Sequence, residues 1–134
     1  MVPLKVLDAS ALVAALVNSG PDGRWAEGML EDSTPTAPQL ALVEATNILR
    51  RLEIAGEITA LEAGMAQRDL LQLRIELYPF PPLADRIWEL RKNLTAYDAW
   101  YVALAESLEA PLVTLDRRLA AAPGPRCAIR VPGG

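Results

Sequence analysis

The chain has 134 residues, of which 51% are hydrophobic and 5% aromatic, and its formal net charge is −4. This length suits one domain, which we place at residues 1–134 with a frayed tail at about residues 132–134. Proteins that hold nucleic acid by general electrostatics are usually basic, so the charge excludes binding of that kind, and any nucleic acid must be engaged locally.

The composition also limits the kinds of metal site. The sequence has no histidine and one cysteine, Cys127. Zinc and copper sites are therefore nearly excluded, and a bound metal would be magnesium, manganese or calcium on oxygen ligands. A single cysteine forms no internal disulfide, which fits a reducing compartment. No signal peptide is evident and no apolar run is long enough to span a membrane, so we expect a cytoplasmic protein.

Strand-like and helical segments alternate along the chain. Five short segments are predicted as strands, one of them broken by prolines: 4–7, 34–38, 75–82, 111–116 and 127–131. Seven segments are predicted as helices: 10–17, 24–31, 39–55, 59–74, 83–94, 98–108 and 117–122. Gly56 is a typical helix stop, and TALE at 59–62 is a capping box. The alternation predicts an α/β fold with a parallel sheet.

Three aspartates have two competing explanations. Asp8 and Asp116 each follow an apolar strand and precede a helix, and Asp98 opens the apolar helix 98–108. Each could be a helix N-cap, which is a common use of aspartate. Asp8 and Asp116 also lie at the carboxyl ends of their strands, where open parallel sheets bind ligands.

Glu44 is harder to explain as a structural residue. It lies mid-helix and caps nothing, with Leu40 and Ile48 one turn away on either side. A glutamate on a core face is costly unless it is paired or binds a cation. A position at the rim that reaches water, or a pairing with Arg51, is the alternative.

Together these acids indicate a metal site. If the strand edges converge, the carboxylates share one small space, where two charges ~4 Å apart repel by about 4 kcal/mol at an effective dielectric constant of about 20. A divalent cation relieves this repulsion, whereas without one the pKa values rise or the loops move apart. The candidate catalytic and metal-binding residues are therefore Asp8, Glu44, Asp98 and Asp116.

Three smaller polar residues fit the same site. Ser10 could order a water there, and Thr114 could bond a carboxylate. Asn47 could bond a carboxylate or a phosphate. Ser10 could equally be an ordinary residue of a first helical turn, and Asn47 a residue that faces solvent.

Four segments in this order resemble the PIN domain, and more narrowly the VapC-type toxin ribonucleases of bacterial toxin–antitoxin pairs. The matching segments are VLDASALVAAL at 6–16, LVEATNILRRLE at 42–53, TAYDAWYVALAE at 95–106 and LVTLDRRLA at 112–120. Each segment alone is only an acid among aliphatic residues. All four together span almost the whole chain.

The resemblance implies a single PIN-like domain in which helices sandwich a parallel twisted sheet of about five strands. It implies cleavage of RNA with Mg²⁺ or Mn²⁺, and it gives the acidic roles to the four candidate acids. Ser10 matches a position where the family frequently has a hydroxyl. The resemblance further implies a toxin homodimer and a small cognate antitoxin made beside it.

An RNA backbone must be drawn towards an acidic pocket. The candidates for phosphate contacts are the basic residues near the acids: Arg50, Arg51, Lys92, Arg117 and Arg118. An ordinary solvated helix face is the alternative for each of them.

Other functions compete with a toxin ribonuclease. One is a PIN-domain ribonuclease without a toxin role. Phosphatases with an aspartyl nucleophile also place Asp after the first strand, but they usually need a second acid where Ser10 stands here. Receiver domains need a late lysine, and the last lysine is Lys92. A non-catalytic interaction protein is the remaining alternative.

Overall fold

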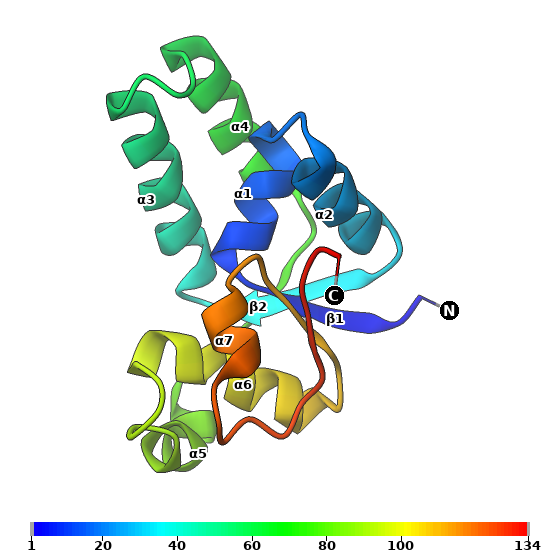
Figure 1. Ribbon diagram of the computed structural model, residues 1–134, viewed down its shortest axis with the longest axis vertical. Coiled ribbons are helices and arrows are strands. Elements are labelled where there is room, and N and C mark those ends of the chain that lie inside the picture. Colours follow the sequence, from blue (N-terminus) through cyan, green and yellow to red (C-terminus); the bar gives the residue numbers. More distant parts are fainter. Residues whose placement is uncertain (1, 134) are drawn as a thin grey trace.

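A parallel sheet forms the centre of the protein (Figure 1). The computed structural model describes residues 2–133. The strands are β1 (Leu4–Leu7), β2 (Thr34–Pro38), β3 (Glu76–Tyr78), β4 (Leu112–Val113) and β5 (Ile129–Arg130). They pair in the order β3–β2–β1–β4–β5, and every pair is parallel. The predicted α/β fold with five parallel strands is confirmed.

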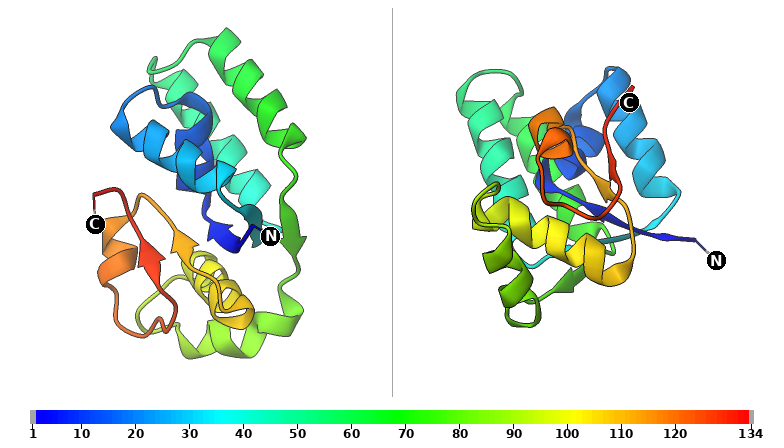
Figure 2. Two further views of the ribbon diagram at one scale, coloured as in Figure 1. Left: turned by 90° about the vertical axis from the view of Figure 1, so that its right-hand side faces the viewer. Right: turned by 60° about the horizontal axis from the view of Figure 1, so that its bottom comes forward.

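Helices cover both faces of this sheet (Figure 2). On one face lie α1 (Ala9–Val17), α2 (Pro21–Glu31), α3 (Ala41–Ile54) and α4 (Ala60–Gln72). The other face is covered by α5 (Ala84–Glu89), which follows the 3-10 helix η1 (Pro81–Leu83), and by α6 (Ala96–Leu108). The short helix α7 (Arg117–Ala121) connects β4 to β5. Within residues 2–133, no helix has both the length and the apolar character needed to cross a membrane.

The core lies on both sides of β1, the central strand. Val6 and Leu7 are fully buried, because a strand with helices on both faces has no solvent-facing side. Leu12 of α1 and Val102 of α6 are also fully buried in the same core. This explains why these two helices are apolar almost all round.

Two predicted helix boundaries are confirmed by local geometry. Thr59 Oγ1 accepts a hydrogen bond from Glu62 N at 3.0 Å, and Glu62 Oε1 accepts one from Thr59 N at 2.9 Å. These reciprocal bonds form the capping box of α4. Gly56 follows the end of α3 with φ +76°, a left-handed conformation that glycine adopts without strain.

Several predicted boundaries are wrong. The helix predicted at 24–31 begins at Pro21, whose fixed φ suits a first helical turn. The helix predicted at 83–94 ends at Glu89, where the chain tightens into turns that bury Leu90 and Leu94. The last two strands pair over two residues each, because the chain turns away after Val113 towards α7.

One cluster of charged groups fixes the segment after α7. The Arg86 guanidinium donates to both carboxylate oxygens of Glu106, at 2.7 and 3.1 Å, and to Gly124 O at 3.0 Å. Glu106 Oε2 also accepts a hydrogen bond from Arg126 N at 2.7 Å. Burial alone would raise the pKa of Glu106, but these hydrogen bonds outweigh it, and its pKa lies below the ordinary 4.5.

We expect Glu106→Gln to lower the free energy of unfolding by about 1–3 kcal/mol at pH 7, the usual range for hydrogen bonds to charged groups. A carboxylate with a depressed pKa stabilises the fold above its unfolded pKa, and this contribution is lost as the pH falls through the folded value. The difference between the two proteins should therefore shrink below pH 4.5. Urea unfolding at several pH values measures it, and a difference that persists unchanged at pH 3 would contradict this account.

Candidate active site

All four predicted acids lie at the carboxyl edge of the sheet. Asp8 directly follows β1, and Asp116 caps α7 in the segment after β4. Glu44 lies in the first turn of α3, not mid-helix, because this helix begins at Ala41. Asp98 lies in the first turn of α6. The ends of these helices that carry the acids face one another (Figure 1).

One cavity brings the acids together. It has a volume of about 330 Å³, and its lining includes Asp8, Glu44, Asp98 and Asp116. Ser10, Asn47 and Arg51 also line it, so three of the secondary candidates share the site. Segments that are far apart in the sequence thus converge on one small acidic space.

Asp8 both caps α1 and is held by two hydroxyl groups. Its Oδ1 accepts hydrogen bonds from Ala11 N at 3.0 Å and from Ser10 Oγ at 2.6 Å. Its Oδ2 accepts one from Thr114 Oγ1 at 2.5 Å. The predicted bond from Thr114 to a carboxylate is confirmed, and the helix-cap explanation of Asp8 is also correct.

The same hydroxyls join the segments after β1 and β4. Ser10 Oγ accepts a hydrogen bond from Leu115 N at 3.1 Å, and Thr114 Oγ1 accepts one from Asp116 N at 3.0 Å. Each hydroxyl therefore donates to Asp8 and accepts from the backbone that leads to Asp116. The position of Asp116 relative to Asp8 is fixed by these contacts.

Glu44 is held by Tyr101, which is not among the predicted site residues. Tyr101 Oη donates a 2.6 Å hydrogen bond to Glu44 Oε1 from the facing helix α6. Tyr101 is 2% exposed and lines the cavity, and burial and the nearby Glu44 raise its pKa. Its signal in the sequence was its spacing, because Asp98 lies one turn earlier on the same face of α6. The alternative pairing of Glu44 with Arg51 is not found in residues 2–133.

Asp98 and Asp116 differ in their local roles. Asp98 is not a cap: Thr95 Oγ1 caps α6 by accepting a hydrogen bond from Asp98 N at 3.2 Å. The expectation that Asp98 opens the helix is wrong, since the helix begins two residues earlier, at Ala96. Asp116 does cap α7, because its Oδ1 accepts from Arg118 N at 2.9 Å and from Leu119 N at 3.4 Å.

Two of the four acids have raised pKa values, as expected where carboxylates share one site. Burial raises the pKa of Asp8, and the charge of Asp98 adds to this rise, while hydrogen bonds to the carboxylate oppose it. Burial, followed by the charge of Asp116, raises the pKa of Asp98. A cation in the cavity would relieve both effects.

The oxygen atoms suit a hard divalent cation, although they do not converge on one point. Within residues 2–133, no three Asp, Glu or Cys side chains are placed closely enough to hold a metal ion together. Hydrogen bonds already direct oxygens of Asp8, Glu44 and Asp116 towards protein groups. The donor set is nevertheless entirely carboxylate, which Mg²⁺ and Mn²⁺ prefer. The residues therefore fit such an ion by their chemistry.

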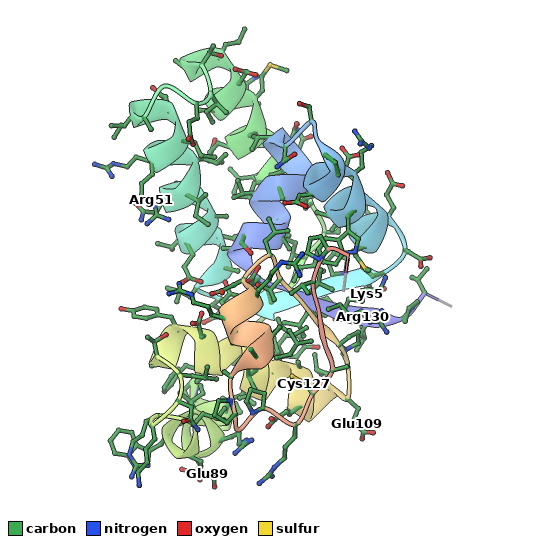
Figure 3. The ribbon with its side chains drawn as sticks, in the orientation of Figure 1. Lys5, Arg51, Glu89, Glu109, Cys127 and Arg130 are labelled. Atoms are coloured by element: carbon green, nitrogen blue, oxygen red, sulfur yellow. The ribbon has the colours of Figure 1, made fainter. Side chains whose placement is uncertain are left out.

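The predicted basic residues do not all lie at the cavity. Arg51 on α3 lines it directly (labelled in Figure 3), whereas Arg50 lines a neighbouring apolar pocket. Arg118 lines an adjoining cavity that includes Asp98. Arg117 donates to Pro132 O, which makes it a contact of the C-terminal segment. Lys92 is exposed and lines neither acidic cavity.

The single cysteine lies away from this site. Cys127 lines a different cavity of about 530 Å³ together with Glu109 and Arg130. Figure 3 shows these three residues on the side of the molecule away from Arg51. Cys127 therefore contributes nothing to the acidic cavity.

Comparison with known proteins connects this site to a family. A family model of the PIN domain matches residues 5–125. Ribonuclease VapC1 of Mycobacterium tuberculosis is 43% identical over 127 residues, which cover 94% of this chain and 96% of that protein. Ribonuclease VapC9 of the same organism is 40% identical over 126 residues, which cover 94% and 96%.

Solved structures give the same result for the fold. The structure of PAE2754 from Pyrobaculum aerophilum is similar with a TM-score of 0.71 and 27% identity, covering 95% of this chain and 83% of that one. VapBC2 from Rickettsia felis, solved bound to a DNA fragment, is similar with a TM-score of 0.66 and 16% identity, covering 96% and 98%. At that identity the second likeness concerns the fold alone. The fold, the matched family model and the VapC relatives together show that this chain belongs to the PIN-domain family.

Proposed function

We propose that this protein is an endoribonuclease that depends on Mg²⁺ or Mn²⁺ and cleaves RNA phosphodiester bonds at the four-acid cavity. The observation that carries the proposal is the convergence of Asp8, Glu44, Asp98 and Asp116 on one cavity of about 330 Å³. Asp8 is buried and the other three acids are half-buried, and carboxylates crowded in such a place are costly to maintain unless they bind a cation. The names of the VapC relatives support RNA as the substrate.

Each acid has a distinct part in this proposal. Asp8, Asp98 and Asp116 would hold the ion, and Glu44 would complete its set of ligands and orient the attacking water. A bound Mg²⁺ or Mn²⁺ supplies Lewis acidity that stabilises charge on the phosphate as its ester bond breaks. Tyr101 would keep Glu44 Oε1 fixed, which leaves Oε2 to accept a proton or a hydrogen bond from the water. Ser10 and Thr114 would fix the carboxylate plane of Asp8.

Basic groups would bring the RNA backbone to these acids. Arg51 lines the cavity and forms no ion pair within residues 2–133, so its guanidinium can contact a phosphate. Binding that uses such contacts weakens as salt rises, since counterions are released from the RNA. Arg50 and Lys92 would contribute further along the strand.

We also propose that the ribonuclease is the toxin of a toxin–antitoxin pair in the cytoplasm, held inactive by a small cognate antitoxin and acting as a homodimer. The sequence resemblance and the 43% identity to VapC1 support this role. A PIN-domain ribonuclease without a toxin role would cleave RNA equally well. Growth arrest on expression, lost in a variant that cannot cleave RNA, separates the two.

We expect Asp98→Asn to reduce Mg²⁺-dependent cleavage of structured RNA by at least about 100-fold, because it removes an ion ligand worth several kcal/mol. Without metal the variant should unfold at a higher temperature than the wild type, since one of the repelling charges is gone. Cleavage assays and thermal melts measure both effects. Asp69→Asn on the exposed surface of α4 is the matched control. Full cleavage by the Asp98→Asn variant, or by the wild type in excess EDTA, would contradict the proposal.

Asp8→Asn separates the cap from the ligand role. Asparagine keeps the helix cap through its side-chain oxygen, but its amide nitrogen cannot accept the hydrogen bond from Thr114 Oγ1. Without metal we therefore expect the free energy of unfolding to fall by about 1–3 kcal/mol while the protein still folds. Mn²⁺ binding by calorimetry and cleavage should both be lost. If the variant kept metal affinity and activity, Asp8 would be only a cap.

Tyr101→Phe tests the support of Glu44. The substitution keeps the buried ring and removes only the hydroxyl, and loss of a group that orients a metal ligand typically lowers metal affinity 10- to 100-fold. We expect a fall of about tenfold in Mn²⁺ affinity with little change in the melting temperature. Tyr97→Phe on the same helix, at a residue that is 59% exposed, should change neither. Equal affinities for the wild type and Tyr101→Phe would show that the hydroxyl does not position Glu44.

A further inference from the structure

A second cavity adjoins the acidic one. It has a volume of about 280 Å³ and shares Asp98 and Asp116 with the four-acid cavity. It lies between the α5–α6 connection, which supplies Asn93 and Thr95, and helix α7, which supplies Arg118. The two acids therefore separate this cavity from α3, which carries Glu44 and Arg51.

The lining combines an apolar floor with polar groups at the rim. Leu94 and Leu119 line its floor, but they are 9% and 3% exposed and so offer only a small aliphatic surface. Asn93 is exposed, and its side-chain amide has no hydrogen-bond partner within residues 2–133. Arg118 has a side chain that is 97% exposed, and its 3.8 Å contact with Asp116 is a weak surface ion pair. The amide and the guanidinium are thus available to a ligand.

Other cavities beside the acids are chemically different. The cavity between α1 and α3 shares Ser10 and Arg51 with the acidic cavity, but most of its lining is aliphatic. The pocket around Val43 is also mainly apolar. Each of these two cavities also contains an amide, a hydroxyl and a guanidinium, but among the three neighbours the cavity at Asn93 alone shares any of the four acids.

Charge decides which part of an RNA strand fits there. Asp98 and Asp116 form one wall, and the ion that they would hold draws the scissile phosphate into the four-acid cavity, which leaves the uncharged base and ribose beside it for this one. The volume, near the lower end of the roughly 300–1,000 Å³ of small-ligand pockets, suits one nucleoside. A base that enters must be unpaired, as in the loops and bulges that proteins read in RNA.

We propose that this cavity binds the unpaired nucleoside next to the phosphodiester that is cleaved. The amide of Asn93 reads the base edge, the aliphatic floor packs against the base, and Arg118 contacts the phosphate on its far side. The strand then runs from Arg51 across the four acids to Arg118. This inference rests on the proposed ribonuclease function and extends it to the choice of the cleavage site.

Cleavage of a hairpin RNA pool with a randomised loop tests the inference, with cut sites read by sequencing in the presence of Mn²⁺. The wild type should show a base preference at one position beside the cut. Asn93→Ala should reduce the ratio of cleavage at the favoured base to cleavage at the other bases about tenfold, which is the discrimination expected from a paired amide contact. It should leave Mn²⁺ binding unchanged. Asn93→Asp, which exchanges donors for acceptors, should change the favoured base.

Arg118→Ala should slow cleavage of all sequences alike and reduce its salt dependence, since a phosphate contact carries no sequence information. Gln67→Ala and Arg68→Ala, on the exposed surface of α4, are matched controls and should change nothing. An unchanged base preference in both Asn93 variants would overturn the nucleoside site while leaving the ribonuclease function intact. A wild type that cuts no RNA with either Mg²⁺ or Mn²⁺ would overturn both.

Discussion

The burial of one carboxylate, that of Asp8, organises this protein. Asp8 is only 8% exposed, so its charge must be compensated inside the fold. Ser10 and Thr114 supply that compensation from two different segments, and each hydroxyl also takes up a backbone N–H from residues 115–116. This matters because β4 pairs over only two residues and offers few ladder hydrogen bonds of its own. The hydroxyls of Ser10 and Thr114 thus supply hydrogen bonds next to β4, where the strand itself has few.

Keeping the carboxylates of the acidic cavity close together costs free energy, which the rest of the fold must offset. Asp8 and Asp98 have raised pKa values because they are buried and near like charges. Rigid elements nevertheless hold them in place: Thr95 fixes the start of α6, and α6 in turn presents both Asp98 and Tyr101 to the cavity. A site of this kind is expected to reduce stability in return for affinity for a cation.

The order of strands and helices could be predicted from the sequence because apolar segments and turn signals alternate clearly. The convergence of Asp8 and Asp116 followed from their positions at strand ends, and Glu44 and Asp98 were added by their place on apolar helices and by the PIN-domain resemblance, which the comparisons confirm. Local hydrogen bonding was less predictable. Thr95 competes with Asp98 for the cap of α6, and only the backbone geometry decides between them. The bond from Tyr101 to Glu44 spans 57 residues, a distance that no local pattern reports. Arg117, a predicted phosphate contact, donates a hydrogen bond to Pro132 O, a partner that no sequence pattern indicated.

That last contact affects how the protein can be handled. Arg117 follows Asp116 directly, and its guanidinium donates to the carbonyl of Pro132 near the end of the described chain. Pro132 is thereby linked to the first turn of α7, where Asp116 accepts its capping bonds. The described N-terminal segment enters β1 at the opposite edge of the sheet from the acids. An affinity tag or a fluorescent fusion attached ahead of β1 is therefore expected to leave the geometry of Asp116 undisturbed.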